Sequence, residues 1–307
     1  MSYTYKNSGV DIDLANSTTN HIQTILNLRK DGDFAGIVEH PLLPEFYLCA
    51  TTDGIGSKIL PLLDFQDYDI IANDLIAMNF NDLACLGAVP TLFLDYIAIN
   101  SLNKNICISI IKALQEKLSA YFCPLVGGEI AELKTIIKQD TLDISGFALG
   151  FVKKSQILGA QNVEKGDILI GLKSNGIHTN GYSLINRLVE DGLIPIEETL
   201  APCYIYLKEI LKLNEHGLIK ACANITGGGI YDNLKRIIPK NLHYQIEKST
   251  LPKMEIFEKI TSIIGKDEAF KVFNMGVGMI IIAKEENFEL IKNIAKVYEP
   301  FKMGAIL

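Results

Sequence analysis

Apolar positions along the chain follow two spacings, and each spacing predicts a different kind of element. Recurrence every three to four residues predicts helices over 69–86, 102–121, 182–189, 204–213, 229–238 and 288–298. Short apolar or alternating runs predict strands over 47–52, 91–99, 123–126, 143–152, 167–172 and 277–283. A chain that mixes both kinds of element in this way is typical of an α+β or α/β protein.

The regular spacing of apolar residues is interrupted between Lys153 and Lys165, where a turn segment precedes a new apolar strand. We therefore predict two domains, over residues 1–155 and 166–307. The full length of 307 residues agrees with this division, because a domain usually holds ~100–200 residues.

Composition limits the possible partners. Acidic residues outnumber basic ones by 36 to 29 without a basic block, so we expect neither nucleic acid nor an anionic membrane as a partner. No run approaches the ~18 apolar residues of a membrane span, and the first residues lack the apolar stretch of a signal peptide. The six cysteines show no CxxC spacing and mostly lie in apolar segments, which predicts free core thiols in a reducing cytoplasm.

The first concentration of chemistry is the segment from Thr51 to Lys58, directly after a predicted strand. Its glycines, Gly54 and Gly56, allow close approach of a ligand to the backbone. Asp53 can bind a hard cation through oxygen, and Lys58 can contact a phosphate as a point charge. The alternative is a tight turn with a surface lysine.

Two acids on the next predicted helix, Asp74 and Asp82, lie eight residues apart and therefore near one face. Acids among apolar neighbours are costly unless they meet a cation, a metal or a donor. We favour a magnesium site made by Asp53 and Asp82, with Asp74 as the acid more plausibly exposed at the surface. Glu129, which follows Gly127 and Gly128 after another predicted strand, completes this site if the glycines are more than an ordinary turn.

Two further loops join a strand to a helix in the second half. Residues 173–183 include Asn180 and His178, and a histidine can exchange a proton near neutral pH, although a lone loop histidine is more often at the surface. Thr226, Gly227, Gly228 and Gly229 offer consecutive amides to a phosphate. In the segment 273–279, Gly278 suits close sheet packing, and Asn274 suits either a structural or a functional role.

Seven segments in the same order resemble the phosphoribosylformylglycinamidine cyclo-ligase family, also called aminoimidazole ribonucleotide (AIR) synthetase. They are Tyr5 to Asp13, TTDGIGSK, NDLIAMNFNDL, LVGGEIAEL, SNGIHTNGYSL, NITGGGIYDN and FNMGVGM, and the resemblance runs from about Tyr5 to Gly304. Each segment alone is weakly specific, whereas all seven in order are strongly so.

The resemblance implies a two-domain AIR-synthetase-like fold. The sheet of the first domain pairs with that of a second subunit to form a barrel, and a second α/β domain closes a cleft over ATP. It also implies a homodimer. The implied reaction is the ATP-dependent ring closure of formylglycinamidine ribonucleotide to 5-aminoimidazole ribonucleotide, with release of ADP and phosphate, in purine biosynthesis.

The resemblance also implies roles for the matching residues. Asp53, Asp82 and Glu129 would bind Mg²⁺, and Lys58 would act with them on the ATP phosphates. The nucleotide would further contact Lys6, Gly54, Gly56, Ser57, Gly127 and Gly128, with Tyr5 and Lys6 on an N-terminal strand that covers it. His178 and Asn180 would lie over the reacting centre, with Asp53 and Lys58 as further catalytic residues. The loop from Thr226 to Gly229 would bind the ribose phosphate of the substrate.

Three segments depart from the family pattern. A glycine-rich stretch with a lysine is reduced to Asp31–Gly36, with Lys30 before it. Pro-Thr-Arg is replaced by Pro202-Cys203-Tyr204, and Met-Pro-Gly-x-Tyr by residues 133–137. The alternatives to the cyclo-ligase are another ATP-dependent phosphoryl transferase, such as a small-molecule kinase, and a nucleotide-binding dimer without cyclisation.

Overall fold

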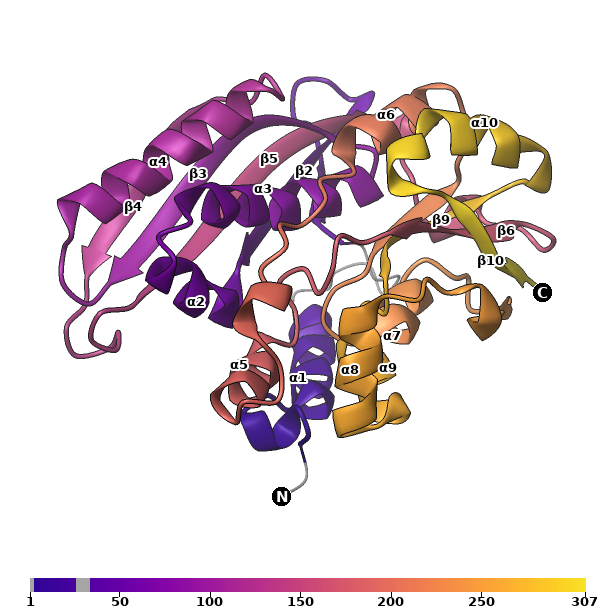
Figure 1. The fold of residues 1–307 in the computed structure, drawn as a ribbon. Coiled ribbons are helices and arrows are strands. Elements are labelled where there is room, and N and C mark those ends of the chain that lie inside the picture. The colour runs from indigo at the N-terminus through magenta and orange to yellow at the C-terminus, as the bar shows by residue number, and fades with distance from the viewer. Residues whose placement is uncertain (1–2, 26–33) are drawn as a thin grey trace.

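The computed structural model describes residues 3–25 and 34–307, which form two five-stranded sheets surrounded by helices. The first sheet has the order β1-β2-β5-β3-β4, antiparallel except for the parallel pair β3 and β4. Its strands are β1 (Gly36–Glu39), β2 (Phe46–Gly54), β3 (Val89–Ile99), β4 (Leu125–Glu132) and β5 (Leu142–Lys153). Alternate residues of β5 are buried on the face where α3 (Tyr68–Cys85) and α4 (Lys104–Ser119) pack (Figure 1).

The second sheet has the order β7-β9-β6-β10-β8, and every pairing in it is antiparallel. Its strands are β6 (Ile168–Lys173), β7 (Ala221–Asn224), β8 (Tyr244–Ile246), β9 (Val277–Ala283) and β10 (Phe301–Ile306). Figure 1 shows α6 (Leu207–Glu215) and α10 (Phe288–Ile294) on one side of it. On the other side are α7 (Gly229–Lys235), α8 (Glu255–Ile264) and α9 (Lys266–Val272) (Figure 1).

Helix α3 joins the two halves of the molecule. Asp67 caps its first turn by accepting a hydrogen bond from the N–H of Ile70 (3.0 Å). Most of its residues are buried, because it contacts β2 and β5 of the first sheet and also β7 and α6 of the second half. Polar side chains on this helix therefore lie at the junction of the two halves, where the candidate site is found.

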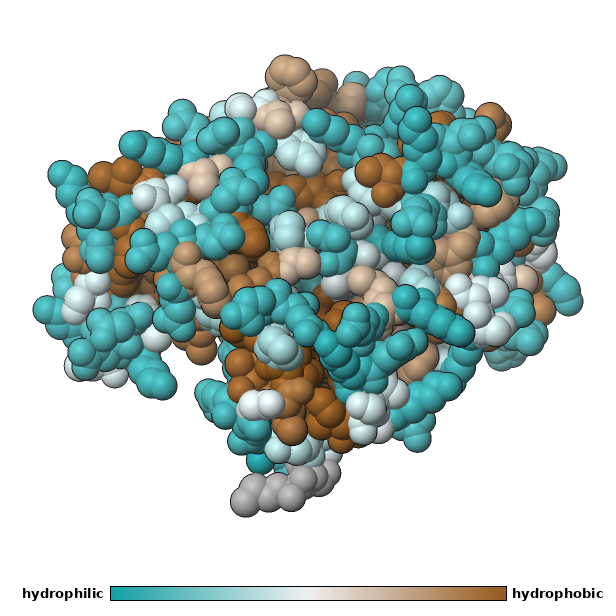
Figure 2. All heavy atoms as spheres, in the orientation of Figure 1, coloured by the Kyte–Doolittle hydropathy of each residue, from teal (hydrophilic) through white to brown (hydrophobic). Residues whose placement is uncertain are grey.

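The N-terminal segment lies against the second half. It comprises the 3₁₀ helix η1 (Lys6–Ser8) and α1 (Ile12–Ile25). Lys271 of α9 pairs with Asp13, and Asn16 donates to Asp232 of α7. Figure 2 shows a mostly hydrophilic face with apolar atoms gathered over α1 and α5 (Tyr182–Glu190), and α1 exposes Leu14, Ile22 and Ile25.

Most elements predicted from apolar spacing are confirmed. The predicted strand 277–283 coincides with β9, and the predicted helix 69–86 coincides with α3 within one residue at each end. The elements that the sequence analysis missed are α1, β1, α2 (Ile59–Asp64), β7, β8, α8, α9 and β10; most are short, although the apolar residues of α8 do follow helical spacing. Among the described residues, every helix is too short or too polar to cross a lipid bilayer. All six cysteines are buried and free, as predicted.

Four predictions about local structure are wrong. The strand predicted at 123–126 is β4, which continues through Gly127, Gly128 and Glu129 to Glu132, so these glycines form no turn. The helix predicted from Tyr204 begins at Leu207, and residues 201–206 precede it without helical structure. Tyr5 and Lys6 lie at the start of a 3₁₀ helix where a strand was expected. The second sheet is antiparallel, so this half is α+β in type rather than α/β.

Candidate functional site

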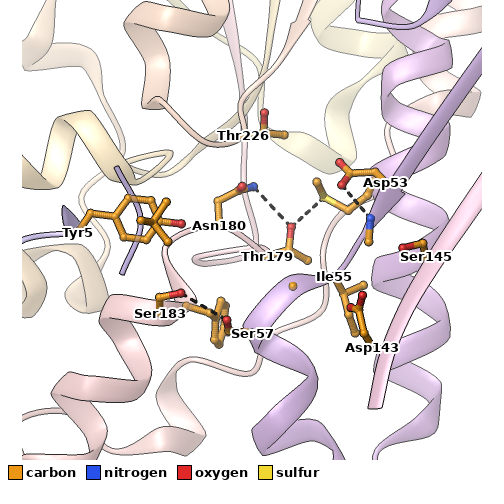
Figure 3. Close-up of a pocket in the computed structure, with 15 residues that line it drawn as sticks. Tyr5, Asp53, Ile55, Ser57, Asp143, Ser145, Thr179, Asn180, Ser183 and Thr226 are labelled. Atoms are coloured by element: carbon orange, nitrogen blue, oxygen red, sulfur yellow. Dashed lines mark hydrogen bonds between the residues drawn. The ribbon is translucent and has the colours of Figure 1, made fainter. Parts of the chain in front are cut away.

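A pocket of about 460 Å³ opens where the two halves and the N-terminal segment meet (Figure 3). The first half contributes the end of β2, the loop after it, Met78 of α3 and the start of β5. The second half contributes the loop before α5, the first residues of α5 and the loop after β7. The lining residues are Tyr5, Val10, Asp53, Gly54, Ile55, Gly56, Ser57, Met78, Asp143, Ser145, Thr179, Asn180, Tyr182, Ser183 and Thr226. Five of the seven sequence segments, far apart in the chain, therefore contribute residues to one pocket.

The loop after β2 forms one wall of the pocket, and its two glycines differ in what they make possible. A Cβ on Gly54 would lie 2.7 Å from the carbonyl oxygen of Ile144, so this residue permits the close pairing of β2 with β5. Gly56 has a left-handed φ of 56° and open space around it. The backbone at Gly56 is thus the part of the loop that a ligand can approach closely.

Asp53 and Asp82 form a pair of acids beside the pocket. Asp53 lines the pocket, and its carboxylate accepts a hydrogen bond from the N–H of Gly54 (2.8 Å). Asp82 of α3 accepts a hydrogen bond from Asn224 (2.9 Å). Burial raises the pKa of Asp53 to about 6 and that of Asp82 to about 7, and the charge of Asp53 adds to the rise at Asp82. The pair is therefore a site whose negative charge a bound cation would stabilise.

Cations do not line the pocket. Of the described lining residues, none is a lysine or an arginine, whereas Asp53 and Asp143 are acids. A triphosphate in this pocket would face carboxylates, which is unfavourable unless a divalent cation accompanies it. Asp143 and Ser145 were missed from the sequence because they lie at the start of a predicted strand, with no glycine-rich motif to mark them.

The wall from the second half carries hydroxyl and amide groups. Asn180 Nδ2 donates to Thr179 Oγ1 (3.5 Å), which donates to the sulfur of Met78 (2.8 Å) (Figure 3). Ser183 Oγ lies 3.3 Å from Ser57 Oγ, so the two walls touch at this point. Asn180 lines the pocket, as its predicted contact with the reactants requires.

His178 lies behind this wall and does not line the pocket. It is 4% exposed and has a left-handed φ of 64°. Its Nε2 accepts a hydrogen bond from the N–H of Asn175 (3.4 Å), which places the imidazole proton on Nδ1. Burial and the charge of Lys58 lower the pKa of His178 to about 3. The side chain is therefore neutral at physiological pH.

The loop that contains His178 is fixed by buried polar side chains. Asn274 donates to the carbonyl oxygens of Gly176 (2.9 Å) and Ile177 (3.2 Å) and accepts from Ser174 (3.0 Å). Gly278 leaves room for the His178 ring and the Tyr206 hydroxyl, as its predicted packing role requires. Asn274, for which the sequence left two roles open, thus fixes the shape of this loop.

Lys58 lies elsewhere than predicted. Its side chain is fully buried, and its Nζ lies 2.6 Å from Asp74 Oδ2 and 2.7 Å from the carbonyl oxygen of Ala201. The Asp74 charge holds the pKa of Lys58 above its ordinary value against the opposing effect of burial. Asp74, expected to be the more exposed acid, is also fully buried. In this arrangement Lys58 is not among the described residues that line the pocket.

Gly127, Gly128 and Glu129 are not brought to the pocket. A Cβ on Gly128 would overlap the carboxylate of Asp95 on β3, so this glycine accommodates a neighbouring strand. Glu129 is exposed on β4 and pairs with Tyr96, which pairs in turn with Ser145. Two strand spacings, about 10 Å, therefore separate Glu129 from the pocket rim. Within the described residues of one chain, no group of three metal-binding side chains forms.

The N-terminal residues divide between the pocket and the surface. Tyr5 lines the pocket, and its N–H donates to Glu268 (2.7 Å). Lys6 does not line the pocket; its side chain is 74% exposed and pairs with Asp11 (2.7 Å). Lys30 and residues 31–33 lie outside the described residues.

Of the glycine-rich loop after β7, Thr226 reaches the pocket. A Cβ on Gly227 would lie 3.4 Å from Asn180 Oδ1, so this glycine is next to the pocket wall. Gly228 and Gly229 have left-handed φ values, and a Cβ on Gly228 would meet the side chain of Asp232. The loop therefore presents Thr226 and Gly227 toward the site, with an acid behind Gly228.

Comparisons with known proteins find relatives that match nearly the whole chain. Residues 32–152 match the family model described as AIR synthase related protein, N-terminal domain, and residues 164–303 match the corresponding C-terminal domain. The phosphoribosylformylglycinamidine cyclo-ligase of Clostridium tetani is 38% identical over 91% of this chain and 88% of its own. That of Thermodesulfovibrio yellowstonii is 36% identical over 99% and 96%. The solved structure of AaThiL complexed with AMPPCP and TMP covers 94% of this chain and 89% of its own. Its TM-score is 0.69 at 17% identity, which shows a shared fold.

Proposed function

Because this chain belongs to the phosphoribosylformylglycinamidine cyclo-ligase family, we propose that it closes the imidazole ring of 5-aminoimidazole ribonucleotide in purine biosynthesis. The substrate is formylglycinamidine ribonucleotide, and one ATP is converted to ADP and phosphate. The observation that carries the proposal is the convergence of the Asp53–Ser57 loop, the Thr179–Ser183 segment and Thr226 on one pocket.

The chemistry needs two steps that such a pocket can favour. The formyl oxygen of the substrate takes the γ-phosphoryl group of ATP, and ADP leaves. The neighbouring nitrogen then attacks the formyl carbon, the C–O bond breaks, and phosphate departs with that oxygen. The first step depends on holding ATP and the substrate in line, and the second on holding the substrate folded with its nitrogen next to the formyl carbon. A pocket with walls from two halves of the chain can supply both orientations.

We propose that magnesium accompanies ATP here, as the residues present fit this ion. Asp53 and Asp82 would bind it, because burial disfavours the charged form of both carboxyl groups and a bound cation would stabilise that form. Magnesium is commonly held by one or two carboxylates together with phosphate oxygens. The ion would supply the positive charge that the described lining residues lack. Glu129 is omitted from this set because of its position on β4.

The other residues divide between ligand contact and support. Asn180, Ser57 and Ser183 offer hydrogen bonds to the reactants, and the backbone at Gly56 can contact a phosphate closely. Thr226 and Gly227 are the part of their loop suited to the ribose phosphate. His178 is a neutral residue behind Asn180, so we assign it to shaping the loop rather than to donating a proton at neutral pH.

We infer a homodimer that forms through the open face of the first sheet, as the family resemblance implies. The face opposite α3 and α4 carries Leu94, Tyr96, Phe147, Leu149 and Phe151, all of them at least partly exposed. Burying such side chains against a second copy would contribute about 25 cal/mol per Å² of apolar area. Sedimentation equilibrium tests the dimer, with an expected mass of twice 34.0 kDa.

We further propose domain limits of 1–155 and 166–307, supported by the separate sheets, and a location in the cytoplasm, supported by the buried free thiols.

The second candidate is phosphoryl transfer to another small molecule, which the shared fold with AaThiL favours. One assay separates the two. Purified protein is incubated with formylglycinamidine ribonucleotide, ATP and magnesium, and both ADP and the aminoimidazole product are followed. Release of ADP that depends on this substrate, with an equal amount of product, supports the cyclo-ligase. Activity with a different acceptor and none with this one would overturn it.

A further inference from the structure

A buried ion pair connects the two halves of the chain beside the pocket. Lys58 Nζ contacts Asp74 Oδ2 (2.6 Å) and donates to the carbonyl oxygen of Ala201 (2.7 Å). The other oxygen of Asp74 accepts from the N–H of Cys203 (2.7 Å). Lys58 and Asp74 are both 0% exposed. We call the side chains of Lys58 and Asp74 the clasp, and residues 201–206 the segment that the clasp binds.

Two asparagines of α3 extend the clasp along the same segment. Asn73 Nδ2 donates to the carbonyl oxygen of Cys203 (2.9 Å). Asn81 donates to the carbonyl oxygen of Tyr204 (2.9 Å) and accepts from the N–H of Tyr206 (2.8 Å). These bonds satisfy backbone groups that neither a helix nor a strand satisfies in this segment. They also explain why α6 begins three residues later than its apolar pattern predicts.

Five hydrogen bonds that Lys58, Asn73, Asp74 and Asn81 make with residues 201–206 are to the main chain. The side chain of Cys203 adds a further hydrogen bond to Asp74. The segment is therefore held mainly through its backbone, so the main-chain contacts between α3 and the second half are compatible with Pro202-Cys203-Tyr204 in place of the family's Pro-Thr-Arg.

Residues 201–206 in turn support the wall of the pocket that the second half contributes. Asn175 Nδ2 donates to the carbonyl oxygen of Pro202 (3.4 Å), and the hydroxyl of Tyr182 donates to the carbonyl oxygen of Thr199. Lys58 Nζ also lies 5.6 Å from the centre of the Tyr182 ring. The loop that presents Asn180 to the pocket is thus held at one end by the segment that Lys58 and Asp74 bind, and at the other end by Thr199, two residues before that segment.

A buried ion pair is a poor source of stability, because the cost of removing two charges from water offsets much of their attraction. Its geometry, by contrast, is specific. From these contacts we propose that Lys58 is a positioning residue of the cyclisation reaction. It fixes the Asn175–Tyr182 loop relative to the Asp53–Ser57 loop, and it is not a ligand of the ATP phosphates. This inference rests on the proposed function for its effect on turnover.

The test uses the full chain with both charges removed, Lys58→Met with Asp74→Asn. The single Lys58→Met change leaves a buried unpaired carboxylate and is expected to unfold the chain in part. The amide introduced by Asp74→Asn keeps an oxygen for the N–H of Cys203, so the double variant should fold. The matched control is Lys302→Met with Glu285→Gln, a lysine–acid pair at the surface.

Three measurements are made on wild type, double variant and control. Amide hydrogen exchange over residues 174–183 should become at least tenfold faster in the double variant. The Kd for AMPPCP with magnesium should change less than threefold, because Lys58 touches no phosphate. The kcat for ring closure should fall at least tenfold, and the control should match wild type in all three.

Two outcomes would overturn the inference. A Kd for AMPPCP that rises tenfold while exchange over 174–183 stays unchanged identifies Lys58 as a phosphate ligand. Unchanged exchange and kcat with a lower midpoint of unfolding identify the pair as structural only. If wild-type protein forms no aminoimidazole product, the proposed function fails. Exchange and nucleotide binding then still decide whether Lys58 positions the loop.

Discussion

Replacing His178 by asparagine should remove one contribution to acid destabilisation of the fold. His178 is buried and neutral, with a pKa of about 3, whereas an imidazole in an unfolded chain has a pKa of about 6.5. Below pH 6.5 the unfolded chain gains a proton that the folded protein does not. The stability that comes from keeping His178 neutral is therefore fully present above pH 6.5 and is lost as the pH falls from there toward 3, whereas the raised pKa values of Asp53 and Asp82 act in the opposite direction.

The magnitude follows from that interval. Each pH unit below 6.5 costs up to about 1.4 kcal/mol, so wild type should lose about 2 kcal/mol through this residue between pH 7 and pH 5. Asparagine suits the left-handed backbone at this position and has no charge to gain. The variant starts from a lower stability because it leaves a small cavity. Its free energy of unfolding should change between pH 7 and pH 5 by about 2 kcal/mol less in the destabilising direction than that of wild type.

Urea unfolding followed by circular dichroism at pH 7 and pH 5 measures the difference directly. His21→Asn is the control, because His21 is exposed on α1, and it should show the pH dependence of wild type. If the His178→Asn variant loses as much stability as wild type between pH 7 and pH 5, the imidazole is not held neutral by burial. The structural role assigned to it would then be wrong.

Three other substitutions test the site and its support. Asp82→Asn should lower magnesium-dependent ATP turnover at least tenfold without unfolding the chain, as measured by coupled ADP release and circular dichroism; unchanged turnover removes Asp82 from the metal site. Asn180→Ala should lower kcat/KM about 10- to 100-fold, as expected for one lost hydrogen bond to a charged group worth about 1.5–3 kcal/mol, while the Tm stays unchanged. A loss of Tm with unchanged kcat/KM would contradict a contact with the reactants. Gly278→Ala should destabilise the fold by about 1–3 kcal/mol in urea titration, because its methyl group would overlap the Tyr206 hydroxyl and press on the His178 ring; a neutral effect would show that this packing relaxes freely.

Local patterns located the elements and motifs that depend on near neighbours in sequence. The strand β9 is apolar at nearly every position, and α3 repeats its apolar residues over its whole length, so both were predicted closely. Asp53, Gly56 and Asn180 were found because glycines and polar side chains gather where a strand meets a helix. Such a cluster of glycines and polar side chains can be recognised within a few consecutive residues.

The predictions that were wrong depend on contacts between distant residues. Gly128 is glycine because Asp95, on the neighbouring strand, occupies the space a side chain would need. Residues 204–206 stay outside the helix because Asn81, far earlier in the chain, binds their backbone. Lys58 points into the protein because Asp74 offers it a partner there. The spacing of residues along the sequence does not predict any of these contacts, because each depends on tertiary packing.

The burial of helix α3 between the two halves determines how the protein unfolds and how fragments of it would behave. It is buried on nearly all sides, with one part of its surface against the first sheet and another against β7 and α6. A fragment that ends near residue 155 would carry this helix with its second contact surface exposed to water, and would be prone to aggregate. The remaining fragment would lose the asparagines that satisfy the backbone of 201–206. Each half thus has its own sheet, but both halves pack against the same helix. Heating should therefore unfold them in one cooperative transition.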